Sequence, residues 1–319
     1  MSVAAEPDLG GTIVGGYLVQ EKLGAGAMGV VYRAVHLDTN RVVALKALRS
    51  DFLDEAAAIQ RFRREAQVAA RLGHPHVGGL VEIVEAGGRF ALALELVEGE
   101  SLRVLIGETI SPDRVIVLAG QLLRGLEHAH ALGLVHRDLK PDNILVDKRN
   151  GRDHARIIDF GIAISSATDS DSIERLTAEG VVIGTPEYMS PEQSQGLPVD
   201  ERSDLYSLGM ILYEMLTGLL PFVGRPVQIL YAKLKRDPPP MAERAPDRPV
   251  DPLLELFVRK LLARDPEQRF ANARSALGVL HLVVSEPASA GPALGIMDVE
   301  RALAVVSLPA PPPLLLRRR

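Results

Sequence analysis

The sequence contains no cysteine, so it can form neither disulfide bonds nor zinc sites with thiolate ligands. Its formal net charge is −5, which provides no global basic field for binding nucleic acid. It also lacks a run of about 18 apolar residues, the length needed to span a bilayer. The N-terminus has neither the basic nor the apolar region of a signal peptide. We therefore expect a soluble, cytoplasmic protein without a transmembrane segment.

The first hundred residues are rich in β-prone runs. Of the 319 residues, 47% are hydrophobic and 24% charged, which is typical of a globular chain with one large domain or two lobes. Residues 17–19, 30–32 and 41–46 predict strands, and residues 80–99 predict two strands across a Gly-Gly turn. Between them, apolar residues recur at helical spacing over residues 54–72.

The remaining sequence is mostly helical in pattern. Helices are predicted at 111–133, with Ser111 as N-cap, at 201–218 and at 251–264. We therefore expect an α+β fold with two lobes. The expected parts are an N-terminal extension at 1–16, a β-rich N-lobe at 17–97, an α-helical C-lobe at 98–283, and a disordered Pro/Ala-rich tail at 284–319.

Three glycines, Gly24, Gly26 and Gly29, follow the spacing G-x-G-x-x-G. This spacing alone fits a plain hairpin turn, a dinucleotide-binding fold or a loop over nucleotide phosphates. In a dinucleotide fold the motif opens a helix, whereas the residues that follow here, 30–32, are β-prone. The context favours a hairpin whose backbone N–H groups can cover phosphates.

Two charged residues are expected to face inward nearby. Lys46 ends the apolar strand pattern of residues 41–46, and Glu65 lies on the inward side of the helix predicted at 54–72. Charges that face inward need a partner. The pair is either structural or holds Lys46 against the phosphates of a nucleotide. These two residues alone do not distinguish the two interpretations.

The stretch HRDLKPDN, residues 136–143, places charged side chains between apolar flanks, where unpaired charge is costly. It resembles the catalytic loop H-R-D-x-K-x-x-N of protein kinases, and residues 159–161 resemble their D-F-G motif. The resemblance extends from about Tyr17 to about Leu282 and is to the eukaryotic-type (Hanks-type) serine/threonine kinases of bacteria. It implies a bilobal protein-kinase-like fold.

The resemblance also implies a role for each polar residue of these motifs. Asp138 would receive the proton of the substrate hydroxyl, and Lys140 would balance charge on the moving phosphoryl group. Asn143 and Asp159 would hold Mg²⁺. Lys46 and Glu65 complete the implied catalytic set, and the implied cofactors are ATP and Mg²⁺.

An ATP site follows from the same resemblance. The glycine-rich loop would cover the phosphates, apolar side chains would enclose the adenine, and the backbone at 95–97 would meet the adenine edge, with Leu94 as gatekeeper. The implied ATP-binding residues are Leu23, Gly24, Ala25, Gly26, Ala27, Met28, Gly29, Val30, Val31, Ala44, Lys46, Glu95, Val97 and Leu145.

Residues 159–192 resemble a kinase activation segment. Thr177 is the favoured phosphosite, and Glu179 either supplies the charge of a second phosphate or is a solvated loop glutamate. Glu192 is expected to pair with Arg269 as a structural contact. The alternative phosphosites are Ser165, Ser166, Thr168, Ser170 and Ser172.

The predicted activity is transfer of the γ-phosphoryl group of ATP to Ser or Thr hydroxyls of proteins, with autophosphorylation of the activation loop. The expected partners are protein substrates and a second copy of the chain for autophosphorylation in trans, without nucleic acid. Two rivals remain: a pseudokinase scaffold, against which the retained catalytic groups argue, and a small-molecule kinase, against which residues 184–192 argue because they fit an extended peptide.

Overall fold

The computed structural model describes residues 8–26, 29–48, 63, 66–160 and 185–295. The chain divides into two compact units, one of residues 1–102 with 124–183 and one of residues 103–123 with 184–319. The units contain strands and helices, so the α+β class is confirmed. Each unit is assembled from segments distant in sequence, and the lobe boundary expected at 97–98 stays a prediction.

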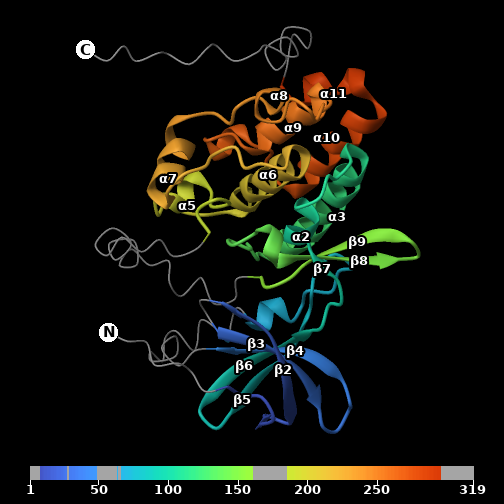
Figure 1. Cartoon of the computed structure of the whole chain (residues 1–319), viewed down its shortest axis with the longest axis vertical. Helices are drawn as coiled ribbons and strands as arrows, with labels where there is room; N and C mark the ends of the chain where they lie inside the picture. The colour runs from blue at the N-terminus through green and yellow to red at the C-terminus, as the bar shows by residue number, and fades with distance from the viewer. Residues whose placement is uncertain (1–7, 27–28, 49–62, 64–65, 161–184, 296–319) are drawn as a thin grey trace. The chain divides into compact units, whose positions relative to one another are not determined.

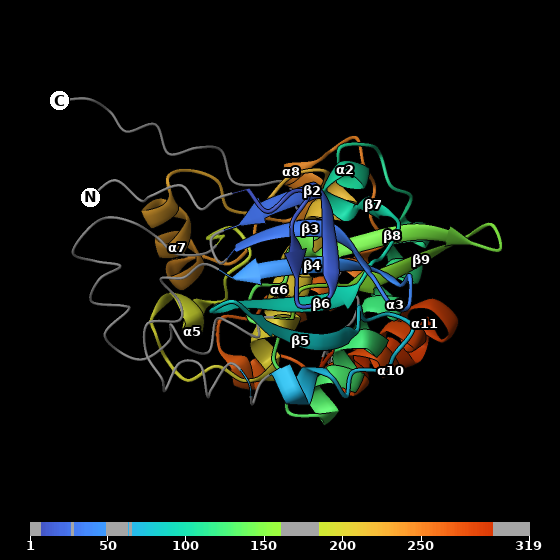
Figure 2. The same cartoon turned by 90° about the horizontal axis from the view of Figure 1, so that it is seen from below.

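A six-stranded antiparallel sheet forms the first part of the first unit (Figures 1 and 2). Its spatial order is β1-β2-β3-β4-β6-β5. All the strands predicted between residues 17 and 99 are present. Their bounds are β1 Ile13–Val14, β2 Tyr17–Gly26, β3 Gly29–His36, β4 Val42–Leu48, β5 Leu80–Ala86 and β6 Arg89–Glu95.

The two faces of this sheet have different roles, because successive side chains along a strand point to opposite faces. One face carries the hydrophobic core of the sheet. The members of this core are Leu9, Val14, Tyr17, Val19, Tyr32, Ala34, Val43, Leu45, Ala47, Val84, Ala91 and Ala93. The alternate residues Val31, Ala44 and Lys46 therefore share the other face with Leu92 and Leu94, their cross-strand neighbours on β6. Three candidate nucleotide residues of β3 and β4 thus gather on one side, whereas the candidate Val30 packs against the core on the other face.

Gly29, at the start of β3, pairs with Leu48 at the end of β4. A Cβ atom on Gly29 would lie 2.0 Å from the backbone oxygen of Ala47. Gly29→Ala is therefore expected to destabilise the first unit by about 1–3 kcal/mol, as overpacking does. Urea denaturation followed by circular dichroism measures the loss.

Gly24→Ala is the matched control for that variant, because a Cβ at Gly24 would meet no atom within 4 Å. Equal stability of the two variants would contradict the steric argument.

A second, three-stranded sheet in the same unit has the order β7-β8-β9, with β7 at Glu100–Ser101, β8 at Ile144–Arg149 and β9 at Arg152–Ile157. The 3-10 helix η2, Pro141–Asn143, leads directly into β8. A hydrogen bond from the backbone N–H of Ile158 to the carbonyl of Asn143, at 2.9 Å, joins the end of β9 to the start of β8. This connection places the residues after β9 beside the HRDLKPDN loop.

Helices α2 and α3 cover residues Leu102–Ile106 and Pro112–Ala131. The predicted start of α3 is confirmed, since Ser111 Oγ accepts a hydrogen bond from the backbone of Arg114 and Pro112 is the first helical residue. Of the helix predicted at 54–72, the structure describes residues 63 and 66–72. Residues 63 and 66–69 are helical, with Ala66 and Ala69 buried, but residues 70–72 are not, so the helix ends earlier than predicted.

Helix α6, Glu201–Thr217, forms the centre of the second unit and is buried on all sides from Ser203 onward. It packs against α9, Pro252–Leu261, where a Cβ on Gly209 would lie 2.9 Å from Cβ of Leu261. Both helices were predicted. The other elements are α5 Pro191–Ser194, α7 Pro226–Lys235, α8 Met241–Arg244, η4 Pro266–Gln268, α10 Ala273–Ser285 and α11 Pro287–Ala293.

The packed part of the chain extends beyond residue 283. Helix α11 lies in the region expected to be a disordered tail, yet Ala290 and Leu294 are buried and Lys260 donates to the carbonyl of Leu294 at 3.2 Å. Small side chains let α11 approach its neighbours closely. Residues 296–319 of the expected tail lie outside the described residues. Within the described ranges, no helix is both long and apolar enough to cross a membrane.

Four histidine rings form a row in the first unit. His128 stacks on His74 with ring centroids 5.3 Å apart, and His76 lies 5.5 Å from His74 and 5.0 Å from His154. His76 Nδ1 carries the proton, because it lies 2.9 Å from the carbonyl of Ala155, which can only accept. Burial lowers the pKa of His76 to about 4, and repulsion from the neighbouring rings and Arg124 adds to the shift despite the Ala155 bond.

This shift predicts a stability that depends on pH. Since the pKa of His76 falls from 6.5 to about 4 on folding, the unfolded chain binds more protons between those values, and the free energy of unfolding decreases as pH falls through that window. His76→Asn, whose amide can still donate to Ala155, is expected to make the decrease shallower. Urea denaturation at pH 7 and pH 5 measures both slopes, and identical slopes would contradict the assignment to His76.

Candidate active site

The glycine-rich motif lies at the end of the β2–β3 hairpin. Gly24 pairs with Val31 and Gly26 pairs with Gly29 across the two antiparallel strands. The residues after the glycines form a strand, which excludes the dinucleotide-binding interpretation. Ala27 and Met28 lie outside the described residues. Residues 24–26 and 29–31 therefore form the two strands of the hairpin that is expected to cover the phosphates.

Lys46 makes a contact that sequence reasoning missed. It lies on β4 between Val31 of β3 and Leu92 of β6, with its side chain 11% exposed. Its ammonium group forms an ion pair with the carboxylate of Asp159. The expected partner, Glu65, lies outside the described residues, so the pairing of Lys46 with Glu65 stays a prediction.

The HRDLKPDN loop holds its polar groups by contacts with one another. Lys140 Nζ lies 2.7 Å from Asp138 Oδ2. Asn143 Nδ2 donates to the carbonyl of Asp138 at 2.8 Å, which leaves the amide oxygen of Asn143 as an acceptor. Both contacts restrain Asp138, whose carboxylate is about a quarter exposed and therefore accessible to a reactant.

Unusual backbone geometry sets the positions of two residues. Arg137 and Asp159 have φ values of 65° and 62°, in the left-handed region that side chains other than glycine rarely adopt. Phe160, next to Asp159, is buried, and its ring lies 4.8 Å from that of His136. His136 Nε2 in turn lies 3.1 Å from the carbonyl of Ile158. The segment that carries Asp159 is therefore anchored to the loop that carries Asp138.

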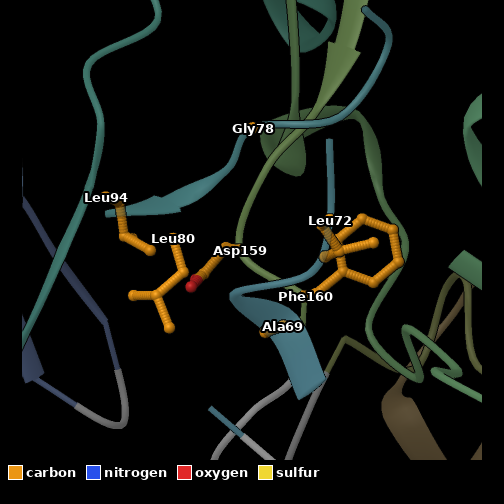
Figure 3. A pocket seen from close by; sticks show the side chains of 7 residues that line it. All are labelled: Ala69, Leu72, Gly78, Leu80, Leu94, Asp159 and Phe160. Carbon is orange, nitrogen blue, oxygen red and sulfur yellow. The ribbon is translucent and has the colours of Figure 1, made fainter. Parts of the chain in front are cut away.

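An apolar pocket opens beside Asp159 (Figure 3). The side chains of Leu80 and Leu94 lie close to its carboxylate, and those of Leu72 and Phe160 lie next to each other. Of this lining, the sequence indicated Leu94 as gatekeeper and Asp159 and Phe160 as part of the D-F-G motif. The pocket is lined by Ala69, Leu72, Gly78, Leu80, Leu94, Asp159 and Phe160.

Residues 95–97, at the end of β6 and just after it, carry the backbone expected to meet the adenine edge. The N–H of Glu95 donates to the carbonyl of Gly79 at 2.8 Å, and its side chain accepts from Arg156 at 2.6 Å, a contact that the sequence did not predict. Val97 is half-buried, as are Ala44 on β4 and Leu145 on β8, whereas Leu23 is 48% exposed. The assignment of these residues to ATP stays a prediction.

In the second unit, Glu192 and Arg269 form the predicted ion pair. Two hydrogen bonds of 2.7 Å join the guanidinium to the carboxylate, and both side chains are buried. Burial raises the pKa of Glu192, but the hydrogen bonds and charge of Arg269 outweigh it, so the pKa lies below its ordinary value. The pair fixes the start of α5, which Ser190 caps.

Comparison with known proteins agrees with this geometry. A family model described as the protein kinase domain matches residues 17–280. The serine/threonine-protein kinase pkn3 of Myxococcus xanthus is 40% identical over 284 residues, which cover 87% of this chain and 52% of that protein. PknB of Mycolicibacterium smegmatis is 38% identical over 301 residues, covering 92% and 47% respectively.

The crystal structure of the PknI kinase domain of Mycobacterium tuberculosis superposes with a TM-score of 0.66 at 26% identity, covering 85% of this chain and 97% of that one. This likeness confirms the expected protein-kinase-like fold. The chain spans about half the length of the curated relatives it matches. With the match to the family model over residues 17–280, these findings show that the chain belongs to the protein kinase family.

Proposed function

We propose that this chain is a protein serine/threonine kinase that transfers the γ-phosphoryl group of ATP to Ser or Thr hydroxyls, including those of its own activation segment. The observation that carries the proposal is the set of contacts in the first unit. Lys46 pairs with Asp159, and Lys140 and Asn143 hold Asp138. Curated relatives at 38–40% identity are named serine/threonine-protein kinases, which supports the choice of acceptor.

The donor set supports Mg²⁺ as the metal ion. The carboxylate of Asp159 and the amide oxygen of Asn143 are hard oxygen ligands on segments joined by the Ile158–Asn143 backbone bond. Mg²⁺ prefers such ligands and binds through few protein groups together with phosphate oxygens. When bound, it would neutralise charge on the β- and γ-phosphates.

Asp138, Lys140 and Lys46 would each have a separate role in phosphoryl transfer. The substrate hydroxyl oxygen forms a bond to the γ-phosphorus while the bond to the bridging oxygen of ADP breaks, and Asp138 takes the hydroxyl proton. Lys140, 2.7 Å from Asp138, offers positive charge to the transferred group. Lys46 is proposed to hold the phosphates once Asp159 turns to the metal. Catalysis of this kind is mostly positioning and electrostatic stabilisation.

Autophosphorylation with labelled ATP tests the proposal directly. The whole chain is incubated with labelled ATP and Mg²⁺, with Asp138→Asn as the matched variant. Label on the wild type and not on Asp138→Asn supports phosphoryl transfer by this chain. Binding of ATP without label on either protein would favour the scaffold alternative, and label on a small molecule alone would favour a small-molecule kinase.

The activation segment and the second copy form part of the same proposal. Thr177 and Glu179 lie outside the described residues, and so do the alternative phosphosites at 165–172. Mass spectrometry of the labelled protein would locate the phosphates. Mixing the wild type with a tagged Asp138→Asn copy tests transfer in trans between two chains. We further propose protein substrates and a cytoplasmic reaction, since the donor is ATP.

A further inference from the structure

In the second unit, the backbone carbonyls of the segment 185–189 accept hydrogen bonds from side chains of other elements. The segment forms turns, with neither helix nor strand. Lys233 Nζ donates to the carbonyls of Pro186, Glu187 and Met189 at 2.8, 2.7 and 2.7 Å. Ser207 Oγ donates to the remaining carbonyl, that of Tyr188, at 2.9 Å. Four consecutive carbonyls are thus held by side chains of other elements.

Lys233 itself is fully buried. It lies on α7 one helical turn after the buried Ile229, and its side chain is 0% exposed. Its ammonium lies 5.5 Å from the ring centre of Tyr206 on α6. A neutral amine has only two N–H groups, so three acceptors within 2.8 Å match the ammonium form. Burial lowers the pKa of Lys233 well below its ordinary value, and the charge of Glu187 opposes the shift in part. The three carbonyl acceptors favour the ammonium form.

A buried ammonium stabilises the packing of α7 less than an apolar side chain would. Moving a charge out of water costs several kcal/mol, and an apolar side chain of similar size would fill the same space without that cost. Unlike apolar packing, hydrogen bonds are directional. Three bonds from the one nitrogen of Lys233 therefore fix the positions of three carbonyls relative to α7. The side chains of the segment alternate accordingly. Pro186, Tyr188 and Ser190 are buried, whereas Thr185, Glu187 and Met189 are partly exposed.

We propose that Lys233 is a positioning residue for the protein acceptor. By fixing the backbone of residues 186–189 it holds the partly exposed side chains of Thr185, Glu187 and Met189 in one arrangement, on which an extended acceptor chain docks. The inference rests on the proposed function, because it concerns the acceptor side of that reaction. Lys233 does not contact the reacting atoms and acts through the backbone that it holds.

Steady-state kinetics of the whole chain, with myelin basic protein as acceptor, test the inference. Lys233→Met removes all three hydrogen bonds at nearly constant side-chain length. It is expected to raise the KM for the acceptor at least about tenfold, since bonds to a charged donor are strong. The KM for ATP and the rate of ATP hydrolysis without acceptor are expected to stay within about twofold, a change of less than 0.5 kcal/mol.

Lys235→Met is the matched control. It removes the same charge from the same helix at an exposed position and is expected to leave every constant unchanged. An unchanged acceptor KM in Lys233→Met would overturn the inference. An equal loss of acceptor phosphorylation and of ATP hydrolysis would overturn it too, because that pattern indicates a general structural role.

A second variant covers the case in which Lys233→Met does not fold. Ser207→Ala removes the bond to Tyr188, together with a longer bond within α6 to the carbonyl of Ser203. It is expected to raise the acceptor KM about threefold, as one lost neutral hydrogen bond to the segment would. If the wild type phosphorylates the acceptor but Ser207→Ala keeps the wild-type KM, the positioning role is refuted while the proposed function stands. If the wild type transfers no phosphate, the proposed function fails and this inference fails with it.

Discussion

Asp159→Asn is expected to lower kcat/KM for phosphoryl transfer by about 10²–10³-fold, the usual cost of removing one charge-stabilising group. Asparagine keeps an oxygen that can accept from Lys46, so the local contact survives in part. It removes the negative charge with which Asp159 would attract the divalent cation, and it weakens the only ion pair of Lys46 among the described residues. The weakened attraction for the metal ion is the effect that reduces binding of the metal-bound triphosphate.

A Mg²⁺ titration at fixed ATP distinguishes this cause from a general loss of structure. Asp159→Asn is expected to need more Mg²⁺ for half-maximal rate, whereas Asp138→Asn loses rate without that shift. Asp38→Asn, which changes an exposed carboxylate in the β3–β4 turn, serves as the control with wild-type behaviour. A variant at Asp159 with the wild-type Mg²⁺ dependence would show that its carboxylate is not a metal ligand.

The partner of Lys46 illustrates what the sequence could not predict. Strands and helices follow from local apolar periodicity, and the predicted strands between residues 17 and 99 are all observed. Sequence reasoning paired Lys46 with Glu65 through helix and strand patterns alone. The observed contact with Asp159 depends on a left-handed backbone at Asp159, which has no local signature in the sequence. It also depends on the β8–β9 hairpin, whose turn is marked by Asn150-Gly151, a signal that our sequence reasoning did not use.

Composition led to a wrong prediction of disorder for residues 287–293, near the C-terminal end of the described residues. Residues 287–293, PASAGPA, have the proline and small residues typical of disorder, yet they form α11. Pro287 at the first helical turn costs no hydrogen bond, and buried Ala290 permits close packing. Lys233 was also missed, although its spacing of four residues from Ile229 places it on the inward face of α7. A buried lysine contradicts the usual preference of that residue type.

The second large effect is expected from Arg269→Met, which should reduce the free energy of unfolding of the second unit by about 3–5 kcal/mol. Arg269 is fully buried and joins Glu192 by two hydrogen bonds of 2.7 Å. Its guanidinium also donates to the carbonyls of Ala263, Arg202 and Arg264. Methionine fills much of the volume but leaves the carboxylate buried without its guanidinium partner, while Ser203 still donates to it.

The pH dependence of stability should change sign in that variant. In the wild type the pKa of Glu192 is lowered, so its contribution is complete above pH 4.5 and is lost as pH falls through the folded-state pKa. Without Arg269, burial, which is the largest contribution, is opposed mainly by hydrogen bonds such as that from Ser203, and the pKa of Glu192 is expected to rise above its ordinary value. The variant is therefore expected to gain stability relative to the wild type as pH is lowered from 7 to 5. Urea denaturation at these two values measures the difference.

Two further variants show whether the loss of stability in Arg269→Met comes from the buried ion pair or from the loss of any positive charge. Arg264→Met removes a surface pair with Asp237, at 3.3 Å, and is expected to cost less than about 1 kcal/mol. The double variant Arg269→Met with Glu192→Gln removes the buried charge as well and should be more stable than Arg269→Met alone. If the double variant were the less stable one, the cost would lie in the lost backbone bonds of Arg269. The unpaired carboxylate of Glu192 would then not be its cause.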